Sequence, residues 1–330
     1  MKGQRIALLG CGYWGRNWAR NLSELGVLAL VCDPEKEGLE RAIETAPSVS
    51  VGVDFERAFQ SREIDGIVIA SPAETHYRLA RQAIEAGKDV LVEKPMTLDS
   101  KDGIELTRLA TDSGRILMVG HLLEYHPAIL RLQELISAGD LGPVNYIYSN
   151  RLNFGKIRTE ENALWSFAPH DIAVILRLFG DTPLDVTCSG GNYLTPELAD
   201  VTVSCLRFES GKRAHIFVSW LHPFKEQKLV VVGQSRMACF EDTSNNKLTL
   251  YDQRVDFLEG LPVLQRNGCQ NLGLLEKEPL REECIHFLEC MKTRQQPLTD
   301  GASGVRVLKV LEACQKSLEN GGGPVSLNGR

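Results

Sequence analysis

Six residues near the N-terminus have the types and spacing of a phosphate-binding turn. The run Gly10-Cys11-Gly12-Tyr13-Trp14-Gly15 follows a short apolar stretch, residues 6–9, and precedes a helical pattern. In such a turn the first glycine permits the bend, the second lets the main chain approach a pyrophosphate, and the third lets helix and strand pack closely. The N–H groups and the dipole at the start of the helix favour negative charge. We therefore expect a dinucleotide site here.

Asp33 follows the second apolar run, residues 27–31, at the distance where an acid is expected to meet the adenosine ribose. Its carboxylate can accept hydrogen bonds from the ribose hydroxyls. A 2′-phosphate would instead face a like charge, at a cost of order a few kcal/mol for an effective dielectric of about 20. The nearest following cation is Lys36, and no arginine follows at once. The expected cofactor is therefore NAD rather than NADP.

Apolar runs and helical patterns keep alternating to about residue 120, which predicts a doubly wound parallel sheet. Ligands of such sheets bind beyond the carboxyl ends of the strands. Polar residues follow three of the predicted strands, so we expect them at the cofactor site. Within this set a lysine can donate to a substrate oxygen, the alternative being a solvated surface lysine. The set consists of Ser71, Pro72 and His76, then Glu93 and Lys94, and then His121.

The chain changes character after residue 122. Short alternating runs from Val144 onward, with turn residues between them, predict one large and mostly antiparallel sheet. Residues 267–278 are expected to form a loop, and residues 321–323 to begin a loose tail. The fold class is therefore α/β, with a Rossmann domain at residues 1–122 and an α+β domain at residues 123–330. The last helix is expected to pack back on the core.

Composition limits the possible partners and the compartment. The 330 residues carry a net charge of −6 without a basic block, which argues against nucleic acid as the main partner. No apolar run reaches about 18 residues, and the N-terminus lacks a signal-peptide pattern. The nine cysteines show no CxxC spacing, which favours reduced thiols in a cytoplasm. No His, Cys, Asp and Glu set has metal-ligand spacing.

Four segments in the order GCGYWG, SPAETHY, AGKDVLVEKP and VGHLLEYHPA resemble the glucose-fructose oxidoreductase, inositol dehydrogenase and MocA (Gfo/Idh/MocA) family. The resemblance covers essentially the whole chain. In that family the lysine of the EKP motif lies beside the reacting sugar hydroxyl, and the proline bends the chain so that nicotinamide and substrate can meet. The resemblance implies a catalytic role for Lys94 and an open C-terminal sheet used for subunit contact, hence a homodimer or homotetramer.

The helix that ends before Gly180 carries the resemblance into the second half. Counted back from Gly180, His170 occupies the position of the family's catalytic histidine, whose imidazole can take the proton from a sugar hydroxyl. The alternative is a histidine that caps or packs locally. Many relatives carry an aspartate four residues earlier, where this chain has Ser166. Asp171 follows His170 instead, and either orients His170 or a substrate hydroxyl, or only caps the helix start.

A polar cluster completes the expected substrate site. Arg151 and Asn153 share one face of a strand, Lys156 and Arg158 follow in a loop, and Trp165 begins the histidine-bearing motif. Such a cluster suits an anionic substrate, the alternative being an ordinary basic strand end.

The glycine turn and the WSFAPHD motif look most like family members that oxidise a secondary hydroxyl of a nucleotide sugar on routes to amino sugars. Oxidation of UDP-N-acetylglucosamine at carbon 3 is the first choice. Two alternatives stay open, an inositol or free-sugar dehydrogenase of the same family and a non-catalytic NAD-binding regulator.

Overall fold

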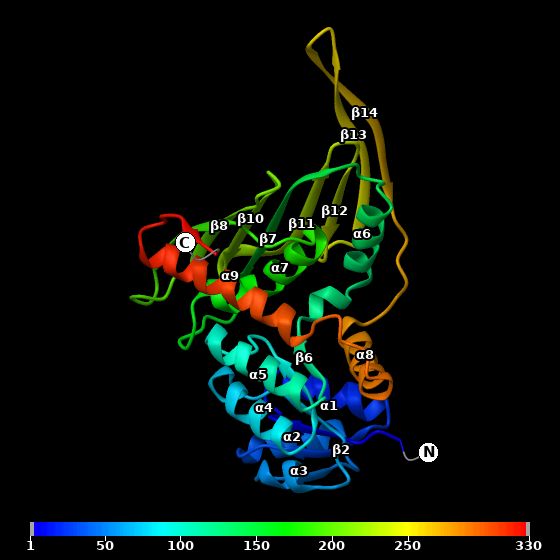
Figure 1. Cartoon of the computed structure of the whole chain (residues 1–330), viewed down its shortest axis with the longest axis vertical. Coiled ribbons are helices and arrows are strands. Elements are labelled where there is room, and N and C mark those ends of the chain that lie inside the picture. The colour runs from blue at the N-terminus through cyan, green and yellow to red at the C-terminus, as the bar shows by residue number, and fades with distance from the viewer. Residues whose placement is uncertain (1–2, 328–330) are drawn as a thin grey trace. The chain divides into compact units, whose positions relative to one another are not determined.

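The computed structural model describes residues 3–327, which form two compact units (Figure 1). The first unit takes the chain up to Tyr125 and residues 278–308, and the second takes residues 126–277 and the chain from Lys309 onward. In the part of the chain that is described, no helix combines the length and the apolar character that a membrane span requires.

The first unit is built on a six-stranded parallel sheet with the order β3-β2-β1-β4-β5-β6. Its central strands β1 and β4 are buried throughout, as expected for a parallel sheet covered on both faces. This order confirms the predicted doubly wound sheet. The strands are β1 (Ile6–Leu9), β2 (Leu28–Cys32), β3 (Ser50–Gly52), β4 (Gly66–Ile69), β5 (Asp89–Glu93) and β6 (Leu117–Gly120).

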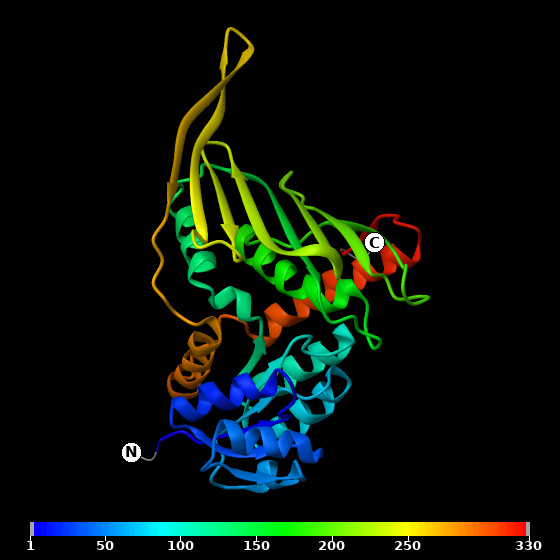
Figure 2. The same cartoon turned by 180° about the vertical axis from the view of Figure 1, so that it is seen from behind.

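Helices cover both faces of this sheet (Figure 1, Figure 2). Helices α1 and α2 pack together on one side, and α4 and α5 pack together on the other. Helix α1 buries Trp18, Ala19 and Leu22, which recur at helical spacing. The helices of this part of the chain are α1 (Gly15–Glu24), α2 (Lys36–Thr45), α3 (Glu56–Gln60), α4 (His76–Glu85) and α5 (Ser100–Asp112), with short 3₁₀ turns η1 (Ala73–Thr75) and η2 (Leu122–Tyr125).

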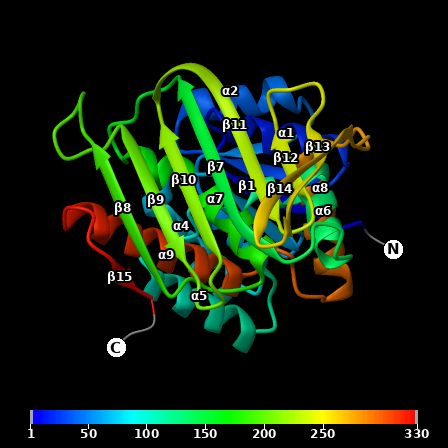
Figure 3. The ribbon, with the colours of Figure 1, turned by 90° about the horizontal axis from the view of Figure 1, so that it is seen from above.

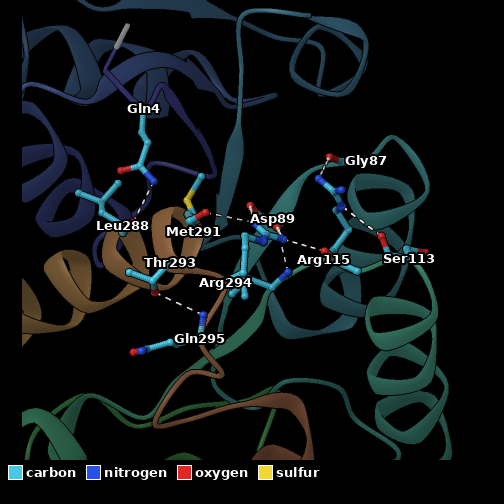
Figure 4. A network of polar contacts seen from close by, with 12 residues as sticks. Gln4, Gly87, Asp89, Ser113, Arg115, Leu288, Met291, Thr293, Arg294 and Gln295 are labelled. Carbon is cyan, nitrogen blue, oxygen red and sulfur yellow. Dashed lines mark hydrogen bonds and ion pairs between the residues drawn. The ribbon is translucent and has the colours of Figure 1, made fainter. Parts of the chain in front are cut away.

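Helix α8 (Pro279–Thr293) belongs to the first unit, so the expected second domain, residues 123–330, is not one compact unit. After the helix, Arg294 donates hydrogen bonds to both carboxylate oxygens of Asp89, at 2.6 and 2.9 Å (Figure 4). The helix and its apolar spacing are predictable from the sequence, but its packing partner is not. The side chains that it buries against α1 and the sheet are Leu280, Cys284, Phe287, Cys290 and Met291.

The second unit contains a nine-stranded sheet with the order β14-β13-β12-β11-β7-β10-β9-β8-β15. Only the β7–β10 pair is parallel among the pairs of this described sheet, which confirms the predicted mostly antiparallel sheet. The strands are β7 (Val144–Phe154), β8 (Asp185–Gly191), β9 (Val201–Arg207), β10 (Arg213–Ser219), β11 (Leu221–Gly233), β12 (Met237–Glu241), β13 (Leu248–Leu258), β14 (Leu261–Asn271) and β15 (Val325–Ser326).

Two expectations for irregular structure in this unit are wrong. The loop expected at residues 267–278 begins only after Asn271, because β14 continues to pair with β13 through polar residues. The tail expected to be loose from residue 321 forms β15, which pairs with Val186 and Asp185 of β8. In both places pairing with a distant strand outweighs a polar or glycine-rich local sequence.

Helix α7 (Ala163–Phe179) lies across one face of this sheet and contacts β7, β9 and β10. Figure 3 shows these strands side by side with α7 behind them. The side chain of Asn162 caps its first turn, and Gly180 ends it at φ +63°. These ends fix the register of the helix that carries His170. The other helices are α6 (Pro127–Ser137) and α9 (Gly301–Glu319), whose first part lies in the first unit.

Candidate functional site

The three glycines of the turn after β1 have distinct surroundings. A Cβ on Gly10 would lie 2.8 Å from the main chain of Ser71, and one on Gly15 would lie 2.3 Å from the carbonyl oxygen of Gly10. The protein's own packing therefore requires glycine at both positions. A Cβ on Gly12 would have no described residue within 4 Å. The open space beside Gly12 fits the close approach of a pyrophosphate.

Asp33 lies at the end of β2, beside this turn. Its Oδ2 accepts a hydrogen bond from the main-chain N–H of Cys11 at 2.6 Å, and its Oδ1 accepts one from Glu35 at 2.9 Å. A Cβ on Gly38 would lie 2.2 Å from the carboxyl carbon of Asp33, so α2 can pack here only through glycine. The carboxylate is thereby fixed where a ribose is expected.

Arg41 is a residue near this site that sequence reasoning missed. Its Nε donates to the carbonyl oxygen of Cys11 at 2.9 Å, which ties α2 to the glycine turn. Lys36, the nearest cation along the chain, instead pairs with Glu40 on the surface of α2. The available signal was helical spacing, since Arg41 lies one turn after Gly38 on the same helix.

His76 joins two of the strand ends. The ring is buried, with Nδ1 at 2.8 Å from the carbonyl oxygen of Pro95 and Nε2 at 2.9 Å from that of Ser71. Burial lowers the pKa of His76. Both ring nitrogens face the main chain, and the expected cofactor contact from His76 is therefore not supported. Pro72, beside Ser71, is exposed.

His121 follows β6 and differs from His76 in its surroundings. The side chain is 2% exposed, and neither ring nitrogen has a hydrogen-bond partner among the described residues. Burial, followed by the positive charge of Lys94, lowers the pKa of His121 to about 4. A neutral ring with unsatisfied nitrogens beside Lys94 fits a polar group of a cofactor or substrate.

Glu93 was expected to contact the cofactor, but its carboxylate is engaged by the protein. Its Oε1 accepts hydrogen bonds from the indole Nε1 of Trp18, at 2.7 Å, and of Trp14. Its Oε2 accepts from the main-chain N–H of Lys94 at 3.1 Å, and a cis peptide bond joins Lys94 to Pro95. Desolvation raises the pKa of the Glu93 carboxyl. The carboxylate holds the strand end rather than facing outward.

Glu283 of α8 is a second residue that sequence reasoning missed. It is fully buried, and neither carboxyl oxygen has a hydrogen-bond partner in the described range. Burial raises its pKa well above the ordinary range, and the negative charges of Glu93 and Glu124 raise it further. Burial therefore favours the protonated, uncharged form of the Glu283 carboxyl. Its position between Leu280 and Phe287, on the apolar face of the helix, was the available signal.

In the second unit, Asp171 and Arg151 were expected to bind substrate, and in the structure they pair with each other. Arg151 donates from Nε to Oδ2 of Asp171 at 2.7 Å and from Nη2 to Oδ1 at 3.3 Å. Ser149 donates to the same Oδ1 at 2.5 Å. Asp171 is 1% exposed, because it lies on the face of α7 that packs on β7. Asp171 does not cap the helix either, since Asn162 does.

The Arg151–Asp171 pair belongs to a longer polar network. With its amide oriented to suit both neighbours, Gln227 accepts from Arg151 at 3.2 Å and donates to Asp242 at 2.8 Å. Asp242 also contacts His126, at 3.5 Å, and Lys247, at 3.0 Å. The contact with His126, followed by that with Lys247, lowers the pKa of Asp242. Arg151 is therefore satisfied inside the unit.

The remaining residues of the expected substrate site are only partly available. Arg158 pairs with Glu160 and Glu161, at 3.5 and 3.1 Å. Trp165 donates to the side chain of Gln315 at 3.1 Å. Lys156 is exposed, and Asn153 and His170 are half-buried. The cationic cluster that suggested an anionic substrate is thus largely neutralised by neighbouring carboxylates.

Metal chemistry receives no support from the described residues. Between residues 3 and 327, no group of three or more His, Cys, Asp or Glu side chains is arranged to hold a metal ion. The polar groups of the first unit instead fit a dinucleotide, with open space at Gly12, a fixed carboxylate at Asp33 and unsatisfied nitrogens at His121.

Comparison with known proteins agrees with this geometry. Residues 4–121 match an oxidoreductase family described as an NAD-binding Rossmann fold, and residues 129–238 match the GFO/IDH/MocA C-terminal domain. UDP-N-acetylglucosamine 3-dehydrogenase of Acidithiobacillus ferrooxidans is 30% identical over 92% of this chain and 94% of its own. The scyllo-inositol 2-dehydrogenase (NAD(+)) of Bacillus subtilis is 24% identical over 96% of this chain and 94% of its own.

Solved structures show the same fold. A structure of UDP-N-acetylglucosamine 3-dehydrogenase GnnA from Acidithiobacillus ferrooxidans superposes with a TM-score of 0.84 at 27% identity, covering 97% of this chain and 99% of that one. The structure of GenD2 from gentamicin A biosynthesis, in complex with NAD, has a TM-score of 0.84 at 21% identity, covering 100% of this chain and 97% of that one. The chain therefore belongs to the Gfo/Idh/MocA family of oxidoreductases, and its first unit is an NAD-binding Rossmann fold.

Proposed function

We propose that this protein is an NAD-dependent dehydrogenase that oxidises a secondary hydroxyl of a sugar. One observation carries the proposal. Lys94 immediately follows β5 of an NAD-binding Rossmann unit, with its main-chain N–H held by Glu93 and its charge acting on the neutral ring of His121. A lysine at the carboxyl end of such a strand is in position to act on a substrate oxygen.

The residues divide the work between cofactor and substrate. The glycine turn holds the pyrophosphate, Asp33 accepts from the adenosine ribose, and His121 offers a ring nitrogen to the nicotinamide end. When bound, NAD supplies the hydride acceptor. Lys94 donates a hydrogen bond to the oxygen that is oxidised, and the imidazole of His170 takes its proton.

We further propose that the sugar is part of a nucleotide sugar, with UDP-N-acetylglucosamine oxidised at carbon 3 as the first choice. The support is similarity along nearly the whole length to an enzyme named for that reaction. Arg151 and Arg158 pair with carboxylates of the protein, whereas Asn153 is half-buried and Lys156 is exposed. We propose that the diphosphate of the nucleotide sugar contacts Asn153 and Lys156.

A free polyol such as an inositol is the second candidate substrate, and one observation favours it. The two arginines expected to face an anion both pair with carboxylates of the protein. An uncharged polyol needs no free cation. A relative named scyllo-inositol 2-dehydrogenase (NAD(+)) covers nearly the whole chain, at lower identity.

NADH formation with a panel of substrates tests the proposal. The panel contains UDP-N-acetylglucosamine, its uronate, free glucose and myo-inositol, each with NAD. Turnover with nucleotide sugars alone, lost in Lys94→Ala and His170→Ala, supports the first choice. Turnover with myo-inositol supports the second candidate. NAD binding without turnover on any substrate, and with unchanged affinity in Lys94→Ala, would favour a non-catalytic regulator.

We also propose that the protein assembles as a homodimer or homotetramer through the C-terminal sheet, in a cytoplasm. The β13–β14 hairpin projects from this sheet (Figure 1), and isolated two-stranded ribbons are marginally stable in water. Its exposed apolar side chains therefore favour a covering partner. All nine cysteines lie in the described range as free thiols, which fits a reducing compartment. The exposed apolar residues are Val255, Phe257, Leu258, Leu261 and Leu264.

A further inference from the structure

Trp14 connects the glycine turn to the segment that carries Lys94. It lies in the turn, one residue before α1, and its indole N–H donates to Oε1 of Glu93. The ring is 38% exposed, so it contributes less to the core than the fully buried Trp18. The main contact of this half-exposed ring is therefore the hydrogen bond from its N–H to the carboxylate of Glu93, which links the position of Glu93 to that of the turn.

Glu93 receives contacts from both sides of this connection. Its Oε1 is shared between Trp14, which lies in the glycine turn, and Trp18, which is fully buried in α1. Its Oε2 accepts from the main-chain N–H of Lys94. One carboxylate group therefore joins the phosphate-binding turn to the main chain of the residue proposed to act on the substrate.

The far side of Lys94 is fixed as well. The carbonyl oxygen of Pro95 lies 2.8 Å from Nδ1 of His76, whose other nitrogen faces Ser71. The Lys94 segment is thus held by His76 on one side and by Glu93 on the other. Of the donors to Glu93 that the structure describes, Trp14 is the one located in the glycine turn.

We propose that Trp14 is a positioning residue that couples occupancy of the glycine turn by a diphosphate to the placement of Lys94, through Glu93. A diphosphate bound at the N-terminus of α1 fixes the turn, which fixes the indole and then the carboxylate that holds the Lys94 main chain. This inference rests on the proposed function for the role of Lys94. The coupling itself is a property of the first unit and is measurable without any substrate.

Amide hydrogen exchange with ADP as the ligand tests the coupling. ADP carries the adenosine and both phosphates but lacks the nicotinamide half, so direct contact with Lys94 is avoided. In the parent protein, saturating ADP is expected to slow exchange in residues 10–15 and also at Lys94, Met96 and Thr97, by roughly fivefold or more. In Trp14→Phe, the slowing at residues 10–15 remains and the slowing at Lys94 and beyond is lost.

Trp18→Phe is the matched control, because it removes the same chemical group from the same carboxylate oxygen but lies outside the turn. It is expected to keep the ADP-dependent slowing at Lys94. Loss of the slowing in both variants would show general loosening of Glu93 and overturn the proposal. The proposal would also be overturned if Trp14→Phe kept the ADP-dependent slowing at Lys94, or if the parent protein did not show it. A failure of ADP to protect residues 10–15 would overturn the dinucleotide site as well.

A kinetic measurement separates positioning from binding. With a turned-over substrate, Trp14→Phe is expected to lower kcat roughly tenfold or more while the Kd for NAD stays within about threefold, because the N–H groups of the turn remain. Trp220→Phe removes an indole bond to the buried carboxylate of Asp200 in the second unit, and it should leave kcat within about twofold. An unchanged kcat in Trp14→Phe, with activity lost in Lys94→Ala, would refute the inference and leave the proposed function standing.

Discussion

The guanidinium of Arg151 holds the carboxylate of Asp171 through two hydrogen bonds, with Nε 2.7 Å from Oδ2 and Nη2 3.3 Å from Oδ1. Both side chains are largely buried, and Ser149 supplies a further donor to Asp171. Because α7 also carries His170, this pair fixes the helix against β7 next to the proposed proton acceptor. Two residues that resemble substrate ligands in the sequence therefore stabilise the scaffold of the site.

Arg151→Ala should destabilise the fold strongly, because it leaves the Asp171 carboxylate buried without its cation. The expected loss in the free energy of unfolding is about 3–5 kcal/mol. Urea unfolding followed by circular dichroism measures it, with Arg158→Ala as the control at a more exposed arginine, where a loss below about 1 kcal/mol is expected. Unchanged stability together with a raised KM would show that Arg151 binds substrate after all.

Gly12→Ala should weaken NAD binding at least tenfold without lowering the melting temperature. The added Cβ has no described residue within 4 Å, so it takes space from the ligand and not from the protein. Gly15→Ala is the contrast, because its Cβ would lie 2.3 Å from the carbonyl oxygen of Gly10 and should cost stability. Calorimetric titration with NAD and thermal unfolding measure the two effects. If Gly12→Ala bound NAD as tightly as the parent, the pyrophosphate would not lie beside Gly12.

Stability should fall as pH rises, in part through Glu283. An unfolded glutamate ionises near its ordinary pKa of 4.5, whereas burial keeps folded Glu283 protonated well above that value. Between the two pKa values the folded state binds one more proton than the unfolded state. The free energy of unfolding therefore decreases by up to about 1.4 kcal/mol per pH unit in this window.

Glu283→Gln should remove this trend. The variant should therefore gain in unfolding free energy relative to the parent as the pH rises above 4.5. Urea unfolding at several pH values measures it. Glu283→Met serves as a second variant without a polar group, and it should show the same trend. A difference that stays constant with pH would mean that Glu283 is ionised in the folded protein.

Phe257→Asp in the β13–β14 hairpin should dissociate the proposed oligomer. The side chain is 72% exposed, and a charge there would oppose burial against a second copy of the chain. Light scattering coupled to size exclusion measures the molar mass. Leu98→Asp, at an exposed apolar residue of the first unit, is the control and should leave the mass unchanged. A mass unaffected by Phe257→Asp would place the interface away from the hairpin.

Local sequence patterns predicted the parts of this fold that depend on local physics. The glycine turn, the buried runs of the parallel strands and the end of α7 at Gly180 follow from spacing and caps within a few residues. The place of helix α8 beside α1 depends instead on contacts between residues more than 250 positions apart, such as Arg20 with Glu278.

The site shows the same limit. The alternation of side chains along a strand correctly placed Arg151 on one face of β7, but it could not predict which helix covers that face. Helix α7 does, and it brings Asp171 to meet the arginine. The carboxylate of Glu93 likewise reads as a ligand in the sequence, and only the fold shows that two indoles already bind it.

Transfer of a labelled hydride tests the central claim most directly. UDP-N-acetylglucosamine deuterated at carbon 3 is mixed with the protein and NAD in a single turnover, and the cofactor is examined by mass spectrometry. We predict deuterium on the nicotinamide ring of NADH with the parent protein and none with Lys94→Ala. Reduction of NAD without deuterium would move the oxidation to another carbon. No reduction here, together with deuterium transfer from myo-inositol deuterated at its ring carbons, would contradict the nucleotide-sugar assignment.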